Sequence, residues 1–256
     1  MKRQYIVMFV FACVLLVTGA SSAYATHSWG GYHWARTTSS FNLKLGNNLS
    51  STWTPILSTA SFDWSQSSVL ETQIVPGLTN PKTCKPTLGR VEVCNSKYGN
   101  NGWLGIAQIW ITNGTHITQA VTKLNDTYFN TAKYNTLAWR NLVTCQEVGH
   151  TFGLDHQDET FDNLNLGTCM DYTSDPSTNQ HPNDHDYEEL ALIYSHLDTT
   201  STVLNSATIN KNGNQIGNSA SDWGKVMGND KTGRANLYRK DLDNGVEVYT
   251  HVFWVE

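Results

Sequence analysis

Residues 145–156 read Cys-Gln-Glu-Val-Gly-His-Thr-Phe-Gly-Leu-Asp-His, and this stretch decides how the chain is interpreted. On a helix, residues four apart share a face, so Gln146 and His150 are expected one turn apart with Glu147 beside them. A glycine then lets the backbone leave the helix, so that His156 can return towards His150. A catalytic zinc ion takes three protein ligands and keeps one position for water. The stretch therefore predicts a zinc site, with Glu147 as the group that takes the proton of that water.

Working outward, the sequence predicts both strands and helices. Apolar residues at helical spacing predict helices over residues 51–70, 136–154 and 184–197, with Gly153 near the end of the second. Alternating or short apolar runs predict strands at 29–34, 72–75, 90–94, 106–111, 117–121 and in the C-terminal run 246–255. The order is mixed strands followed by helix, loop and helix, which indicates an α+β fold.

The composition favours a packed domain and excludes some functions. The 256 residues suit one domain, or one domain with a small appendage. Hydrophobic residues make up 39% of the chain and charged residues 15%, which is enough apolar material for a core. The formal net charge is −5 and no basic patch stands out, so nucleic acid is not expected as a partner.

The N-terminus has the pattern of a secretory signal peptide. Lys2 and Arg3 precede an apolar run over residues 5–17, and Ala23-Tyr24-Ala25 is a small-x-small cleavage site. The apolar run is shorter than the roughly 20 residues that span a membrane, which argues against an anchor. Residues 1–25 are therefore predicted to be removed, leaving a secreted chain with no membrane association.

Cleavage removes Cys13 and leaves four cysteines, at positions 84, 94, 145 and 169. An even number of cysteines in an exported chain predicts two disulfides, for which three connectivities exist. No Cys-x-x-Cys pair is present, which argues against a structural zinc site made of cysteines.

The segment 146–156 resembles the metzincin zinc signature H-E-x-x-H-x-x-G-x-x-H. Glu147, His150, Gly153 and His156 match this signature, and Gln146 replaces its first histidine. The resemblance implies Zn²⁺ as the cofactor and residues 146, 150 and 156 as its ligand positions.

A second part of the resemblance lies downstream. Met170 fits the methionine turn that metzincins carry beneath the metal. Tyr172 stands two residues later, where the astacin-like and serralysin-like branches have a tyrosine that ligates zinc or stabilises the oxyanion. Cys145 and Cys169 directly precede Gln146 and Met170 in the chain, so a bridge between them would clamp the turn under the site. We therefore favour the pairs Cys145–Cys169 and Cys84–Cys94, the second being a short loop.

The resemblance covers roughly residues 29–197 and implies a zincin-like domain over 26–198. Such a domain has a small, twisted, mostly parallel sheet, a zinc helix, a methionine turn and a closing helix. Residues 199–256 are not covered and are predicted to form a linker and a small strand-rich extension. The implied activity is that of a secreted, monomeric zinc endopeptidase that cleaves protein or peptide substrates, with Glu147 as general base and Tyr172 as oxyanion stabiliser.

Gln146 leaves three outcomes open for the metal site. Its amide oxygen can ligate zinc, although it is a weaker donor than imidazole. Alternatively Tyr172 or another residue completes the ligand set, or zinc binding is lost and the protein is an inactive metzincin-like binding protein. Another alternative is a surface-adhesive protein whose aromatic C-terminal segment carries the function.

His181 and His185 raise the separate question of a second metal site. They lie in the sequence His-Pro-Asn-Asp-His-Asp, where acidic and asparagine side chains are also typical of the beginning of a helix. We therefore interpret this segment as a polar helix start.

Overall fold

The computed structural model describes residues 26–203 and 215–256, and the predicted signal peptide lies outside these residues. The helices are α1 Thr54–Trp64, α2 Asp126–Phe129, α3 Leu137–His150 and α4 Asp184–Ile193. The strands are β1 His33–Trp34, β2 Phe41–Asn48, β3 Leu70–Pro76, β4 Val91–Ser96, β5 Trp103–Thr112, β6 His116–Asn125, β7 Lys225–Asn229, β8 Ala235–Asp241 and β9 Glu247–Trp254. Within the described part of the chain, no helix is long and apolar enough to cross a membrane.

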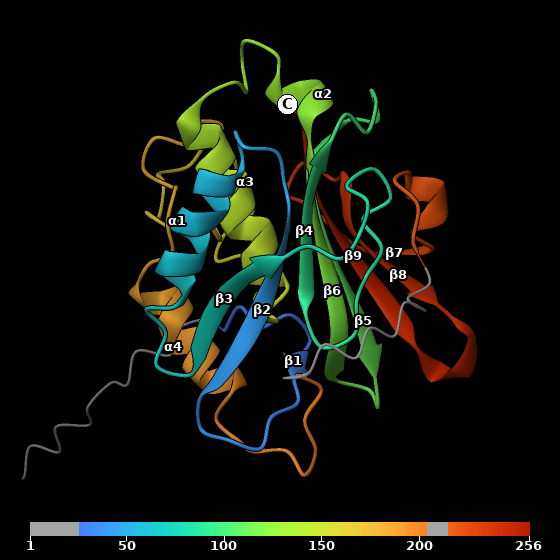
Figure 1. Ribbon diagram of the computed structural model, residues 1–256. Helices are drawn as coiled ribbons and strands as arrows, with labels where there is room; N and C mark the ends of the chain where they lie inside the picture. The colour runs from blue at the N-terminus through green and yellow to red at the C-terminus, as the bar shows by residue number, and fades with distance from the viewer. Residues whose placement is uncertain (1–25, 204–214) are drawn as a thin grey trace, which may run out of the picture.

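The strands form one large mixed sheet, so the prediction of a small, mostly parallel sheet is wrong while the coarse α+β assignment is confirmed. The nine-stranded sheet has the order β3-β2-β4-β6-β5-β9-β8-β7, with β1 paired to β6 outside this path. Strands β3, β2, β4 and β6 are parallel, whereas β5, β9, β8 and β7 continue the sheet in antiparallel fashion. The sheet is larger than expected because the C-terminal strand β9 pairs directly with β5, and β8 and β7 extend the sheet beyond it (Figure 1).

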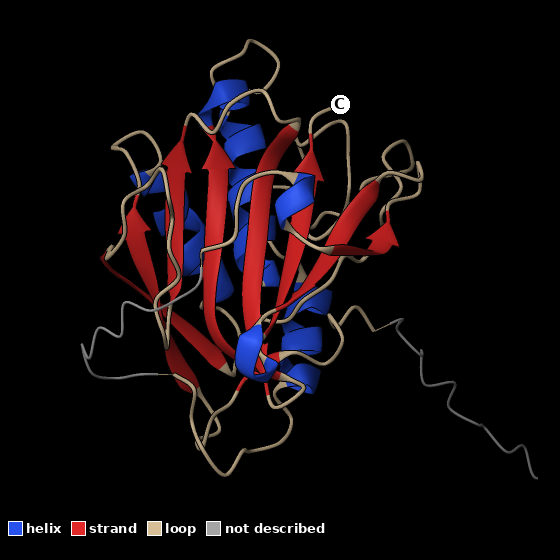
Figure 2. Cartoon of the chain, turned by 90° about the vertical axis from the view of Figure 1, so that its right-hand side faces the viewer, coloured by secondary structure: helices blue, strands red, loops and turns tan. Residues whose placement is uncertain are grey.

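Helices α1 and α3 pack together on one face of the sheet (Figure 2). The larger apolar cluster lies on this side and includes Trp64 from α1 and Val148 from α3. A second cluster lies under the loops that cross the other face, and it joins Trp103 and Val252 of the sheet to Trp223. Because both faces are covered, nearly every residue of β5 and β6 is buried.

Local sequence signals explain where helix α3 begins and ends and where the β5–β6 hairpin turns. Thr136 is the N-cap of helix α3, and its side chain accepts a hydrogen bond from the backbone N–H of Trp139. The chain leaves the end of α3 at Gly153, whose φ of 99° is in the left-handed region. The β5–β6 hairpin turns at Asn113 and Gly114, both with positive φ, as a tight hairpin requires.

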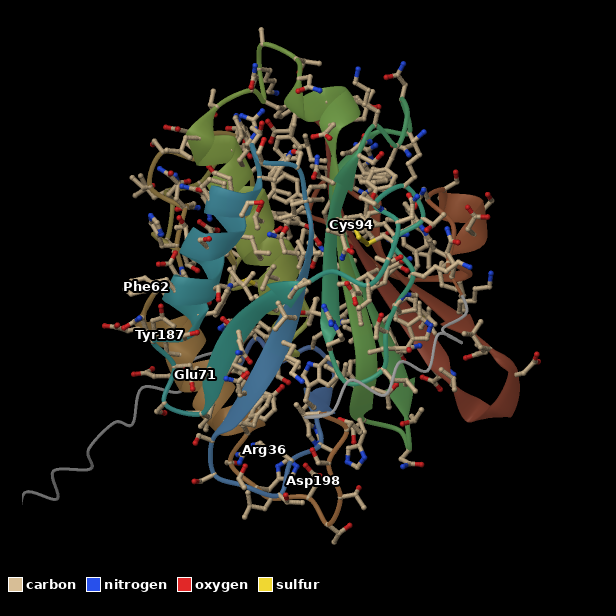
Figure 3. The ribbon with its side chains drawn as sticks, viewed as in Figure 1. Arg36, Phe62, Glu71, Cys94, Tyr187 and Asp198 are labelled. Carbon is tan, nitrogen blue, oxygen red and sulfur yellow. A yellow bond between two sulfur atoms is a disulfide. The ribbon has the colours of Figure 1, made fainter. Side chains whose placement is uncertain are left out.

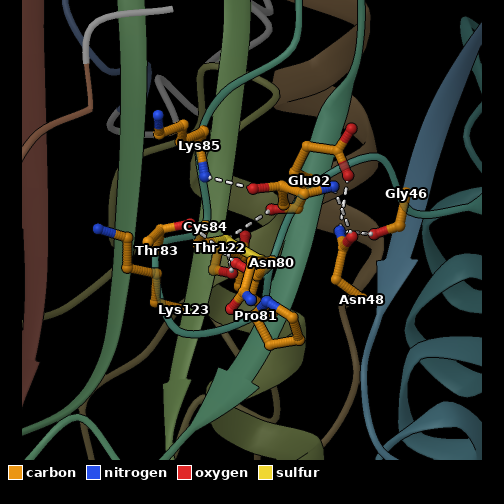
Figure 4. The surroundings of a disulfide bond; sticks show 12 residues. Gly46, Asn48, Asn80, Pro81, Thr83, Cys84, Lys85, Glu92, Thr122 and Lys123 are labelled. Atoms are coloured by element: carbon orange, nitrogen blue, oxygen red, sulfur yellow. Dashed lines mark hydrogen bonds between the residues drawn. A yellow bond between two sulfur atoms is a disulfide. The ribbon is translucent and has the colours of Figure 1, made fainter. Parts of the chain in front are cut away.

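Both predicted disulfides are confirmed. Cys145 in α3 is bonded to Cys169, and Cys84 is bonded to Cys94 in β4. Figure 4 shows the surroundings of the Cys84–Cys94 bridge, where the Asn48 amide donates to a carboxylate oxygen of Glu92 at 2.6 Å. The Cys145–Cys169 bridge fixes the segment around Met170 to helix α3, which carries His150.

Candidate metal centre

Three buried histidines converge at the end of α3. His150 is the last residue of the helix, His156 follows in the next loop, and His251 comes from β9. The Nε2 atoms of His150 and His156 are 3.1 Å apart. The His251 ring centroid lies 4.0 Å from that of His150 and 4.5 Å from that of His156. One nitrogen from each ring lies within 4.8 Å of the others, so the three can share one ion.

Hydrogen bonds on the far side of each ring fix its orientation. His150 Nδ1 lies 2.8 Å from the carbonyl oxygen of Leu154, which accepts its proton. His156 Nδ1 lies 3.2 Å from a carboxylate oxygen of Glu159. With Nδ1 of each ring in an outer contact, the Nε2 atoms of His150 and His156 are the nitrogens that face each other. Such paired nitrogens with outer hydrogen bonds are the usual arrangement of metal-ligating histidines.

The donor set fits a zinc-type ion. In a tetrahedral site with metal–nitrogen bonds of 2.0–2.1 Å, neighbouring nitrogens are about 3.4 Å apart, close to the 3.1 Å between His150 and His156. Burial, and the adjacent His156, lower the pKa of His150 well below its ordinary value. Burial and His150 do the same for the pKa of His251. Neutral imidazole is the form that binds metals, and the lowered pKa values of His150 and His251 favour that form.

Glu147 provides a buried carboxylate beside these rings. It is fully buried, and its Oε2 lies 3.7 Å from His251 Nδ1. Within the described residues, neither carboxylate oxygen of Glu147 nor Nδ1 of His251 has a hydrogen-bond partner. Burial raises the pKa of Glu147 well above its usual range. Unpaired buried polar atoms are costly, and a bound cation would compensate them.

Tyr172 lies at the cluster as a neighbour of His251. Its hydroxyl oxygen is 3.1 Å from His251 Nε2 and also accepts a hydrogen bond from the Asn236 side chain at 3.1 Å. Its ring packs against His156, with centroids 4.3 Å apart. Tyr172 therefore orients His251 and connects the loop after α3 to strands β8 and β9.

Gln146 is hydrogen-bonded to the segment around Met170. Its side-chain amide donates to the carbonyl oxygen of Cys169 at 2.7 Å, which links α3 to the residue before Met170. Met170 itself packs closely on the helix, because a Cβ at Gly149 would lie 2.8 Å from its sulfur. Gln146 Nε2 thus supports this segment, whereas its buried Oε1 accepts no hydrogen bond from the described residues, and the third imidazole nitrogen of the cluster comes from His251.

The sequence interpretation did not single out His251. The residue stands in an alternating aromatic strand whose pattern carries no ligand spacing. It reaches the site because β9 pairs with β5 in a register that places His251 opposite Ala107. This pairing depends on the whole sheet, so no local signal near residue 251 could have revealed it.

A surface pocket lies next to the cluster. It is lined by residues 155–160 and Lys231, so His156 forms part of its wall.

The predicted polar helix start at residues 181–186 agrees with the structure, since Asn183 caps α4 through a reciprocal capping box with Asp186. His181 Nδ1 lies 2.7 Å from a carboxylate oxygen of Asp63. Among the described residues, the clusters able to hold a metal include neither His181 nor His185.

The comparisons with known proteins add no identity. The sequence matches no protein-family model and no curated protein sequence. The chemistry of the cluster therefore carries the functional argument.

Proposed function

We propose that the chain is a secreted zinc-dependent hydrolase of peptide bonds, with His150, His156 and His251 as the metal ligands. The observation that carries the proposal is the convergence of three imidazole nitrogens beside a buried carboxylate that accepts no hydrogen bond from the described residues. The metzincin-like spacing of residues 147–156 supports peptide-bond hydrolysis in particular. Two disulfides are consistent with an extracellular location.

The residues around the cluster have separate tasks in this proposal. A zinc ion held there would polarise the scissile carbonyl and acidify a water molecule. Glu147 takes the proton of the attacking water and passes it to the leaving amine. Leu154 and Glu159 hold the rings of His150 and His156 through their hydrogen bonds. The pocket at residues 155–160 is the side from which substrate approaches.

One observation favours a second candidate, a metal-binding protein without turnover. Glu147, His150 and His251 are only 0%, 1% and 2% exposed, and a closed site is typical of structural zinc. In that case the ion would join α3 to β9 and stabilise the fold.

The two candidates are separated by measuring zinc and proteolysis on the same samples. We expect the mature chain, residues 26–256, to cleave fluorescently labelled unfolded casein. Glu147→Gln should keep the zinc content of the wild type and lose activity by about a hundredfold or more, since it removes only the proton carrier. His156→Ala should lose one zinc equivalent and all activity.

Other results would change the assignment. The non-catalytic candidate would be established if the wild type cleaves nothing and the His156→Ala variant binds one zinc ion fewer than the wild type. If His156→Ala binds as much zinc as the wild type, both candidates are wrong.

A further inference from the structure

A second group of histidines lies away from the buried centre and shares no residue with it. His33 is in β1 and His116 begins β6, and these two residues are paired in the parallel register of the strands. His196 and Asp198 follow helix α4. Figure 3 labels Asp198 beside Arg36 at the lower end of the molecule, where the segment after α4 meets the chain beyond β1.

Three donor atoms in this group point at one another. His33 Nε2 lies 3.2 Å from His196 Nε2 and 3.5 Å from Asp198 Oδ1. His196 Nε2 lies 3.8 Å from the same carboxylate oxygen. These separations are close to the edges of about 3.4 Å expected for ligands around a tetrahedral zinc ion.

The donors are already oriented by a surrounding set of hydrogen bonds. His33 Nδ1 lies 2.9 Å from the carbonyl oxygen of Gly31, which leaves its Nε2 facing the cluster. Asp198 Oδ2 accepts a hydrogen bond from the Arg36 backbone at 2.9 Å, so its Oδ1 is turned towards the histidines. His116 Nε2 lies 3.1 Å from that Oδ1. Such outer contacts fix the ligands of metal sites and raise their affinity.

A cation suits this arrangement better than a shared proton. A proton on His33 Nε2 can lie on the line to only one of its two neighbours, whereas an ion at the centre contacts all three donors. Two imidazoles with one carboxylate favour zinc and related transition metals, because magnesium and calcium prefer sites made of oxygen. We propose that His33, His196 and Asp198 form a second site for a zinc-type divalent ion, with His116 supporting Asp198.

The site has a structural role. The side chains of His33 and Asp198 are nearly buried, whereas that of His196 is 53% exposed, so the ion would join β1 to the segment after α4 near the surface. It adds to backbone hydrogen bonds that already join these segments, from Asp198 to Arg36 and from Thr202 to Ala35. Bound zinc should therefore stabilise this end of the fold independently of the buried centre.

The test uses calorimetric titration of the metal-free mature chain with zinc chloride. His196→Ala removes one ligand that is half-exposed, so the fold should persist, as circular dichroism can check. His181→Ala is the matched control, because this histidine is 55% exposed and also contacts a carboxylate, that of Asp63. We expect His196→Ala to lose one zinc equivalent or weaken it at least about tenfold, and His181→Ala to bind as the wild type does.

His156→Ala distinguishes this site from the buried centre. This variant should still bind the zinc ion held by His33, His196 and Asp198, which His196→Ala loses, whether or not the proposed hydrolase activity exists. If His196→Ala binds zinc with the stoichiometry and affinity of the wild type, the second site does not exist. The same conclusion follows if the His156→Ala chain binds no zinc.

Discussion

At the scale of single residues, the proposed metal site assigns different tasks to Gln146 and His251. Gln146 occupies the helix position but donates to the Cys169 carbonyl oxygen, and so stabilises the turn below the site. His251 supplies a ring nitrogen from a distant strand. An amide is a weaker zinc ligand than imidazole and a good hydrogen-bond donor, which is why we propose His251 and not Gln146 as the ligand.

This division predicts opposite effects for two substitutions. His251→Ala should weaken zinc binding at the buried centre at least about tenfold, because it removes a ligand. Gln146→Ala should keep that zinc and cost about 1 kcal/mol of unfolding free energy, because it removes one buried hydrogen bond. Zinc competition with a chromophoric chelator and urea denaturation measure the two effects. Zinc lost in Gln146→Ala and kept in His251→Ala would show that the glutamine is the ligand.

The buried side chain of Lys123 should make the unfolding free energy depend on pH. The side chain is fully buried, and its ammonium donates to Ile216 and Asn218. Burial lowers its pKa from the ordinary 10.5 to about 7. Between these values the unfolded chain holds a proton that the folded chain has released, so the unfolding free energy should rise with pH across this window.

Urea denaturation at several pH values checks this dependence. Lys123→Met should lose the part of the rise that this group causes, since methionine does not titrate. Lys97→Met, at an exposed position, serves as the control and should keep the rise. An identical pH profile in Lys123→Met and the wild type would mean that the buried ammonium is not the cause.

At the scale of elements, helix α3 and the segment around Met170 meet at Gly149. A Cβ at position 149 would lie 2.6 Å from the Trp64 ring and 2.8 Å from the Met170 sulfur. Gly149→Ala should therefore destabilise the fold by about 1–3 kcal/mol through overpacking, despite the better helix propensity of alanine. Chemical denaturation measures the loss. Gly228→Ala, in β7 where the nearest atom is 3.3 Å away, is the control and should change stability far less.

The elements that sequence could predict are those with local signals. Helices α3 and α4 have side-chain caps, and the β5–β6 hairpin has Asn113-Gly114 at its turn. Strands β2, β7 and β8 were not predicted, because polar residues and glycines interrupt their apolar pattern. The first strand is only His33–Trp34, shorter than the predicted 29–34, since Gly30 and Gly31 adopt positive φ values that break extended backbone.

The residues of the candidate site likewise differ in whether local sequence signals predict them. Glu147, His150 and His156 lie within one short segment, so helix periodicity and one glycine were enough to bring them together. His251 depends on the pairing of β9 with β5, and the second cluster depends on the pairing of β1 with β6. These are contacts between segments far apart in the chain, which periodicity within one segment does not reveal.

At the scale of the whole molecule, the C-terminal strands are part of the sheet that carries the site. Strand β9 lies between β5 and β8, and it contributes both His251 and apolar residues such as Val252 to the interior. Residues 215–256 thus complete the buried centre, which residues 26–203 hold only in part.

This arrangement predicts the result of truncation. A chain of residues 26–203 should aggregate, because it exposes the hydrogen-bonding edge of β5 and the apolar surface that β9 covers. Co-expression with a separate 215–256 fragment should restore solubility and zinc binding at the buried centre. The same fragment with His251→Ala should restore solubility while leaving zinc at that centre at least about tenfold weaker, since it restores the strand and not the ligand. Light scattering and zinc titration measure the two outcomes. A soluble 26–203 chain that binds zinc at the His150–His156 pair as tightly as the full mature chain would mean that β9 contributes neither the missing ligand nor the cover of the sheet.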